Sequence, residues 1–264
     1  MKNITVFTSN QPRHIGLLKE LSKVSEKVYA IIESKTVHPG KIDGFFKKSN
    51  VMHQYFKEVI KSENKFFGNI NFLPKNVIPI VIRMGDLNNL KMSILNKSLE
   101  SDLFIVFGSS FIKGDLIDFL VDKKTINIHM GVSPYYRGSS CNFWALKNSD
   151  YNYVGSTIHM LSKGLDSGDM LFHALPSFEP NPFDYTMRSV KAAHLGLVTH
   201  IKNNSLYDLE RVIQNKNLEI SYTKNIEFSD EIASDFLNKG VSLSVFKQKV
   251  EKRNLSEFIN PYIH

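Results

Sequence analysis

The chain has 264 residues, of which 42% are hydrophobic and 22% charged, with a net charge of +7 and a single cysteine. These values are ordinary for a soluble globular protein with one sizeable core, and the single cysteine excludes both an internal disulfide and a cysteine-based zinc site. No apolar run approaches the ~18 residues of a membrane-spanning helix, and the N-terminal residues become a strand too early for a signal peptide, so we expect a cytoplasmic protein.

The first half of the chain alternates predicted strands with predicted helices. Strands are expected at residues 4–8, 28–33, 77–83 and 103–107, which are short apolar runs bounded by turn residues. Helices are expected at about residues 15–21, 52–60, 90–98 and 113–121, where apolar residues recur at helical spacing. This alternation predicts an α/β fold: a Rossmann-like, mostly parallel sheet with helices on both faces.

The second half continues this pattern and then changes character. Strands are expected at 125–129, at 154–160 and just after 171, and a long helix at 185–202. We expect two parts, a catalytic domain at 1–205 and a small, mostly helical C-terminal appendage at 206–264. The appendage carries eight basic and nine acidic residues, which leaves +8 on residues 1–205. A basic body suits an anionic ligand, although solubility alone explains the charge equally well.

Polar side chains mark the ends of two of these predicted strands. In residues 125–129 apolar and polar residues alternate, so Asn127 and His129 share one face. His159 lies near the end of the next strand, and a loop with two glycines follows and contains Asp166. Open α/β sheets bind ligands where the carboxyl ends of strands lead into such loops. We therefore expect Asn127, His129 and Asp166 to meet in one cleft.

These residue types suit the transfer of an acyl group to an amine. The Asn127 amide can donate a hydrogen bond to an oxyanion, and His129, with an ordinary pKa of roughly 6.5, can exchange a proton near neutrality. Asp166 can stabilise the imidazolium or relay the amine proton. The chemistry requires neither a metal nor a nucleophilic Ser or Cys, so Cys141 is expected to be inert. His159 is equally consistent with a place in the core and with one beside the site.

The same residues resemble the folate-dependent formyltransferases. That family has Asn-x-His, then Leu-Pro and often Arg-Gly, then Asp-x-Gly. The corresponding residues here, within about 100–175, are Asn127-Ile128-His129, Ser133-Pro134, Arg137-Gly138 and Asp166-Ser167-Gly168. The resemblance implies that Asn127, His129 and Asp166 are catalytic and that 10-formyltetrahydrofolate is the co-substrate, with no metal.

The resemblance also implies where the two substrates bind. The positions that match the family's pteridine pocket are Gly108, Ser110, Phe111, Ile112 and Leu165, several of which would act through backbone groups. Candidate contacts to the acceptor are Asn10, Arg13, Arg137 and His159.

Three acceptors known in the family compete. Methionyl-tRNA formyltransferases carry a C-terminal β-barrel domain, whereas residues 206–264 are fewer, look helical and have a net charge of −1. Binding a phosphate backbone demands Lys and Arg. Glycinamide ribonucleotide enzymes have a glycine-rich loop after the first strand, but residues 8–12 here contain no glycine. A nucleotide-linked amino sugar is therefore favoured, as in enzymes that build surface polysaccharides such as the O-antigen of lipopolysaccharide.

Two further functions remain open. A formyltetrahydrofolate hydrolase would use the same three residues on water, and a folate-binding protein would not use them for catalysis. We expect no nucleic-acid partner and no membrane insertion, and we expect that residues 206–264 could form a homodimer contact.

Overall fold

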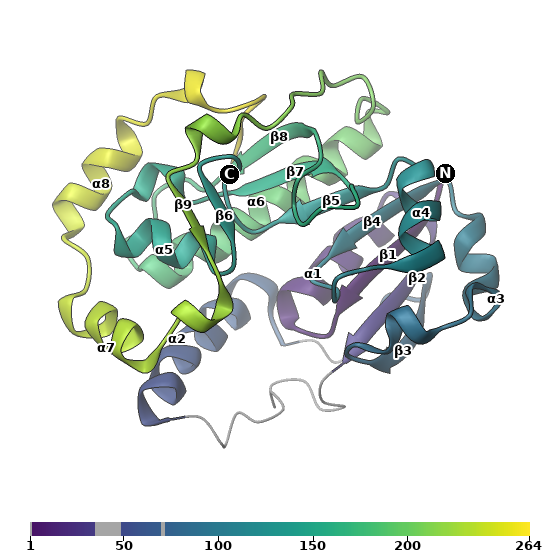
Figure 1. Ribbon diagram of the computed structural model, residues 1–264, viewed down its shortest axis with the longest axis horizontal. Coiled ribbons are helices and arrows are strands. Elements are labelled where there is room, and N and C mark those ends of the chain that lie inside the picture. Colours follow the sequence, from purple (N-terminus) through teal and green to yellow (C-terminus); the bar gives the residue numbers. More distant parts are fainter. Residues whose placement is uncertain (1, 35–48, 70–71) are drawn as a thin grey trace.

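The computed structural model describes residues 2–34, 49–69 and 72–264. In these residues the central element is an eight-stranded sheet with the order β10-β8-β7-β5-β4-β1-β2-β3 (Figure 1). A two-stranded pair, β6 and β9, lies beside it. The strands are β1 (Lys2–Ser9), β2 (Ser25–Ser34), β3 (Val77–Arg83), β4 (Leu103–Phe107), β5 (Ile126–His129), β6 (Tyr136–Gly138), β7 (Ser156–Met160), β8 (Met170–Leu175), β9 (Ser221–Thr223) and β10 (Tyr262–Ile263).

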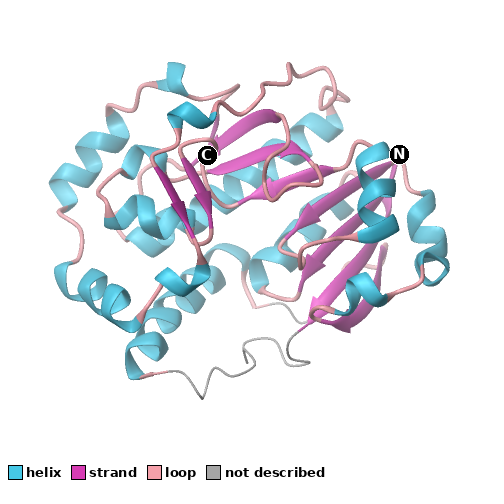
Figure 2. Ribbon diagram, in the orientation of Figure 1, coloured by secondary structure: helices cyan, strands magenta, loops and turns pink. Residues whose placement is uncertain are grey.

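Helices lie around the large sheet, and several extend beyond it on the left of the view (Figure 2). They are α1 (Pro12–Ser22), α2 (Asn50–Phe67), α3 (Met92–Leu95), α4 (Gly114–Asp122), α5 (Cys141–Lys147), α6 (Pro182–Lys202), α7 (Asp230–Lys239) and α8 (Leu243–Glu251). Short 3-10 turns are Asp86–Asn89, Asn96–Glu100, Tyr151–Tyr153, Lys216–Leu218, Asn225–Glu227 and Leu255–Glu257. In the part of the chain that the structure describes, no helix has the length and apolar character needed to cross a bilayer.

Most of the strand pairs are parallel. Only the β5–β7 and β7–β8 pairs are antiparallel within the large sheet. The prediction of a mostly parallel α/β sheet is therefore confirmed. Because β1, β4 and β5 are adjacent and parallel, their carboxyl ends open at the same edge, which is where such sheets bind ligands.

Two apolar layers, one on each face of the sheet, form the main core. Strand β1 contributes to both, because alternate side chains point to opposite faces: Ile4 and Val6 lie in one layer and Phe7 in the other. Helices α1 and α6 pack on the first layer through residues such as Leu18, and α4 packs on the second through Leu120. This arrangement confirms helices on both faces.

Residues after 206 are tied to the rest of the chain by backbone pairing as well as by packing. Strand β9 pairs in parallel with β6, and β10 extends the large sheet beside β8. Helices α7 and α8 place Phe236 and Phe246 in a third apolar cluster, together with Tyr151 and Tyr185. The division of the chain at residue 206 remains a prediction.

One predicted helix is wrong. The helix expected at 90–98 is interrupted: α3 ends at Leu95, and a 3-10 turn follows with Asn96 at φ 32°. A residue with positive φ cannot continue a right-handed helix. The helix expected from 185 begins earlier, at Pro182, because the Asn181 side chain caps it by accepting hydrogen bonds from the first backbone N–H groups.

Truncating Phe246 tests whether α8 belongs to the cooperative fold. Phe246 is fully buried, so Phe246→Ala should lower the free energy of unfolding by about 3–5 kcal/mol, the usual cost of removing a buried phenylalanine ring. Urea denaturation followed by circular dichroism measures this change. The control, Val245→Ala, alters a side chain on the same helix that is 42% exposed and should have little effect. Equal stabilities for the two variants would contradict the integration of α8.

Candidate functional site

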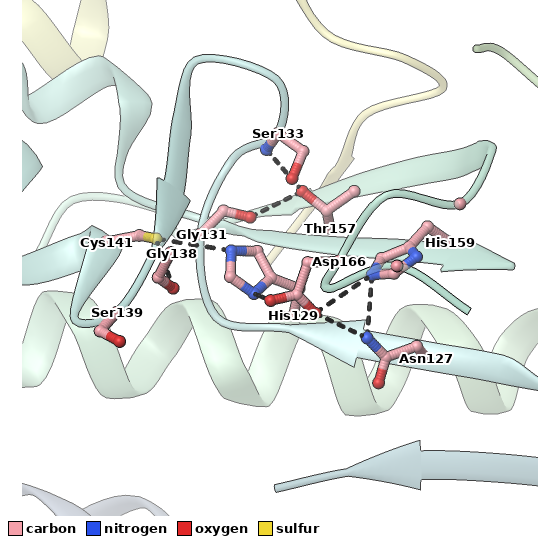
Figure 3. Close-up of polar contacts among 12 residues, drawn as sticks. Asn127, His129, Gly131, Ser133, Gly138, Ser139, Cys141, Thr157, His159 and Asp166 are labelled. Atoms are coloured by element: carbon pink, nitrogen blue, oxygen red, sulfur yellow. Dashed lines mark hydrogen bonds and ion pairs between the residues drawn. The ribbon is translucent and has the colours of Figure 1, made fainter. Parts of the chain in front are cut away.

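The register of the sheet brings three polar side chains together. Asn127 on β5 lies directly opposite His159 on the antiparallel strand β7, and His129 lies opposite Thr157. Directly opposed residues of an antiparallel pair project from the same face, so Asn127, His129 and His159 are neighbours there (Figure 3). Because β5 ends at His129, this group stands at the carboxyl edge of the sheet.

Asp166 reaches the same group from the loop between β7 and β8. Its Oδ2 is 3.2 Å from His129 Nδ1, and its Oδ1 accepts a hydrogen bond of 3.0 Å from Asn127 Nδ2 (Figure 3). The backbone of Asp166 has φ 44°, a left-handed conformation that Asp tolerates better than most residues. The structure thus brings the three predicted catalytic residues into contact around one carboxylate.

The carboxylate and the imidazole stabilise each other's charged forms. Burial by itself lowers the pKa of His129, but the Asp166 carboxylate, aided by Cys141, outweighs burial and holds that pKa well above 6.5. Burial by itself raises the pKa of Asp166, but the neighbouring His129 dominates and keeps it well below the ordinary value of 3.8. This mutual stabilisation favours an imidazolium at His129 paired with a carboxylate at Asp166.

His159 fixes the orientation of the Asn127 amide. Its Nδ1 is 2.9 Å from the Met160 carbonyl oxygen, which can only accept, so Nδ1 carries the proton. Its Nε2 is then free to accept a hydrogen bond of 2.9 Å from Asn127 Nδ2. Both hydrogens of the Asn127 amide are directed inward, one to His159 and one to Asp166. With 1% of its surface exposed, His159 acts on the site through Asn127.

Cys141 lies against the other side of the His129 ring. Its Sγ is 3.5 Å from His129 Nε2 and 3.4 Å from the Gly138 carbonyl oxygen (Figure 3). Gly131 makes room for this contact, because a Cβ there would stand 2.5 Å from the Cys141 Cβ and 2.7 Å from His129 Nε2. From the sequence we expect Cys141 to be inert, whereas the structure places its thiol next to the candidate proton carrier.

A cavity of about 470 Å³ opens beside these residues. It is lined by all three predicted catalytic residues, by the five predicted cofactor residues (Gly108, Ser110, Phe111, Ile112 and Leu165), and by Asn10, Arg13 and His159. Phe111 and Leu165 are each about half exposed, at 49% and 52%. Two large apolar side chains left exposed at a cavity are typical of a site that receives an apolar, flat ligand.

A buried carboxylate that sequence reasoning missed shapes the cofactor side of this cavity. Glu33, at the end of β2, is fully buried and accepts hydrogen bonds from the backbone N–H and hydroxyl of Ser110 and from the backbone N–H of Gly85. Gly108, with φ 75°, packs so closely on His14 that a Cβ would collide with the imidazole. The sequence signal for Glu33 is an acidic side chain at the end of the strand predicted at 28–33.

The C-terminal region also holds the loop that carries Asp166. Gln214 Nε2 donates hydrogen bonds to the carbonyl oxygens of Asp166, at 2.8 Å, and Gly168, at 2.9 Å. Next to it, Met170 and Val212 form an isolated backbone bridge. The sequence offers no local signal for this contact, because Gln214 is 48 residues beyond Asp166.

Arg137, one of the four predicted acceptor contacts, is not among the residues that line the cavity. It lies on β6, where its Nη1 is 3.1 Å from Glu219 Oε2 and its guanidinium stands over the Tyr222 ring. Arg13 does line the cavity and is held by Glu63, whose Oε1 is 2.7 Å from Arg13 Nη1. Within the described ranges, no group of three or more His, Cys, Asp or Glu side chains is arranged to hold a metal ion.

The ion pair makes a measurable prediction. In wild-type protein the NMR signals of the His129 ring should titrate above pH 6.5, and in Asp166→Asn they should titrate at lower pH because burial then dominates. The pair stabilises the fold fully between pH 3.8 and 6.5. This stability is lost as pH falls through the lowered pKa of Asp166, and as pH rises through the raised pKa of His129. Identical His129 titrations in both proteins would contradict the pairing.

Parts of this chain resemble known proteins. Residues 71–198 match the family model described as Formyl transferase. A methionyl-tRNA formyltransferase from Desulforamulus reducens is 30% identical over 95 residues, which cover 36% of this chain and 29% of that protein. This chain therefore spans less than a third of that relative's length.

Two solved structures share the fold. A 4-N formyltransferase from Francisella tularensis has a TM-score of 0.54 at 19% identity and covers 94% of this chain and 87% of its own. Glycinamide ribonucleotide transformylase 1 from Symbiobacterium toebii has a TM-score of 0.52 at 16% identity. The match covers 81% of this chain and 95% of that protein. The matched region contains Asn127, His129 and Asp166. Residues 71–198 therefore resemble the formyl transferase family.

Proposed function

We propose that the protein is an N-formyltransferase that moves the formyl group of 10-formyltetrahydrofolate to the amine of a nucleotide-linked amino sugar. The observation that carries the reaction type is the single carboxylate of Asp166, which binds both His129 and Asn127 at the side of a ligand-sized cavity. That the protein acts in O-antigen synthesis and lies in the cytoplasm remain predictions.

The cavity is suited to the folate co-substrate, which supplies an activated formyl group when bound. Val106, Ile112 and Ile117 give it an apolar lining. The loop from Gly108 to Ser110 offers backbone groups, anchored by Glu33, for the polar edge of a pteridine. Phe111 and Leu165 would cover the faces of such a ring, which fits their large exposed areas.

Asn127 and His129 would stabilise the negative charge that develops on the formyl oxygen. Preorganised donors in a site with little water are effective in this role. The Asn127 hydrogens already engage Asp166 and His159, so this amide would share one of them with the formyl oxygen. The imidazolium of His129 adds a positive charge beside it.

His129 can also balance the protons of the reaction. As a C–N bond forms to the acceptor amine and the bond to the folate nitrogen breaks, the amine must lose one proton and the folate nitrogen must gain one. The imidazolium donates its proton and then takes up the one from the amine. We assign the exchange to Nε2, because sulfur is a weak acceptor and Cys141 holds that proton less firmly than Asp166 holds the one on Nδ1.

The choice of acceptor rests on the net charge of residues 206–264 and on the groups near the site. The curated relative named above is a methionyl-tRNA enzyme, and the alignment covers 29% of it. Residues 206–264 have a net charge of −1, which is poorly suited to a tRNA backbone. The cavity that Asn127, His129 and Asp166 line is called the catalytic cavity below. Arg13 also lines it and provides a guanidinium for a diphosphate, a group that arginine recognises well. Glycinamide ribonucleotide is disfavoured as the acceptor because this chain has no glycine-rich loop after β1.

Incubation with 10-formyltetrahydrofolate and a panel of dTDP-, UDP- and GDP-linked amino sugars, read by mass spectrometry, tests this function. We expect one sugar to gain a formyl group. Release of formate without any formylated sugar would replace the proposal with a hydrolase. Formylation of methionyl-tRNA or glycinamide ribonucleotide alone, run in parallel, would replace the acceptor.

The pH dependence of the reaction tests the role of the imidazolium. Because His129 must be protonated to donate, kcat/KM should fall as pH rises through its pKa, at a pH above 6.5. Cys141→Ala removes a contact that raises this pKa, so the fall should begin at lower pH. Cys141→Ser, which keeps a polar group near Nε2, should restore part of the difference. A profile without a fall above pH 6.5 would contradict this role of His129, and identical profiles in all three proteins would contradict the contribution of Cys141.

A further inference from the structure

A second, larger cavity meets the catalytic cavity at Arg13 and Met130. Its volume is about 710 Å³, and both residues line both cavities. Met130 directly follows His129, so the junction adjoins the candidate proton carrier. A transferase with two substrates needs two binding regions that meet at the reacting atoms, and the first cavity holds the residues expected to bind folate.

The walls of this second cavity are aromatic, and we call it the aromatic groove. They come from α2, α5, α6, α7 and the segment before α7, and include Tyr55, Phe143, Phe183, Phe228 and Phe236. The Tyr55 ring packs edge-to-face on three of these rings, at centroid distances of 5.0–5.7 Å. Such mutual contacts hold the walls in place before any ligand arrives.

Charged side chains are few in the groove. Among the residues that line it, only Arg13 and Asp230 carry a charge, and Asn225 adds an exposed amide. Flat rings that stack on aromatic side chains and present polar edges suit such a site, as nucleobases do. Among the described residues, Arg13 is the only cation that a free diphosphate would meet in the groove.

Arg13 at the junction is suited to phosphate. Glu63, which is 2% exposed, binds its Nη1, and its Nε has no hydrogen-bond partner among the described residues. Arg13 therefore stays fixed by Glu63, while 23% of its side-chain surface remains exposed. Guanidinium groups bind phosphate oxygens through more than one N–H at a time.

The order of these groups matches the order of groups in a nucleotide sugar. In the structure, His129 is followed by Arg13 and then by the aromatic groove. In a nucleotide-linked amino sugar, the amine on the sugar is followed by the diphosphate and then by the nucleoside. We propose that the aromatic groove binds the nucleoside of the acceptor, with the diphosphate at Arg13 and the amino sugar at Asn127 and His129. This proposal rests on the proposed function, and it assigns the choice of nucleotide to residues outside the catalytic cavity.

Binding of dTDP, UDP and GDP, measured by calorimetry, tests the groove without requiring turnover. Wild-type protein should bind one of them, and Phe228→Leu should weaken this binding at least about tenfold, within the range for loss of a base–aromatic stack. Phe178→Leu is the matched control, because Phe178 packs in the same apolar cluster but does not line the groove. Unchanged binding of 10-formyltetrahydrofolate in both variants checks their folding.

Kinetics with a truncated acceptor separate the two proposals. For a nucleotide sugar, Phe228→Leu should raise KM while kcat stays unchanged, and for the matching amino sugar 1-phosphate it should change neither. Absence of binding by all three nucleotides, or equal binding by wild type and Phe228→Leu, would overturn the groove assignment. Nucleotide binding that depends on Phe228 without formylation of any nucleotide sugar would keep the groove and reject the proposed acceptor.

Discussion

One partly buried carboxylate organises the candidate site. Asp166 accepts a hydrogen bond from Asn127 and pairs with His129, so it orients the amide and holds the imidazole in its charged form at the same time. Removing a carboxylate from such a network leaves a buried imidazolium without a counter-charge, which is costly. The rest of the site is built so that this single group reaches both partners.

Several distant segments place that carboxylate. The short strand β5 supplies Asn127 and His129, the left-handed backbone of Asp166 turns its loop back over the strand, and Gln214 holds the loop from the C-terminal region. The C-terminal region therefore takes part in the site as well as in the sheet edge. Loops positioned by a rigid sheet commonly carry function in this way.

The fold and the central residues could be predicted from the sequence because their signals are local. Alternation in residues 125–129 placed Asn127 and His129 on one face, and the structure confirms it through the β5–β7 register. The predicted roles of these residues in catalysis remain proposals. The helix expected at 90–98 failed because apolar spacing does not reveal that Asn96 takes a positive φ.

Contacts between distant segments could not be predicted in this way. Gln214 and Glu33 act on loops 48 and 77 residues away, and no periodic pattern encodes such distances. Arg137 was chosen for its place in a motif, but its neighbour Glu219 comes from the C-terminal region and pairs with it. Cys141 appeared inert because a sequence does not show that Gly131 leaves room for its thiol beside His129.

The most direct test of the account is single-turnover formyl transfer by Asp166→Asn compared with wild type, with 10-formyltetrahydrofolate binding measured on the same samples. The substitution keeps the size of the side chain and removes its charge. We expect a rate at least about 10²-fold lower, the usual contribution of a positioned proton donor, with folate binding nearly unchanged. Transfer at the wild-type rate would contradict the claim that this carboxylate organises the chemistry.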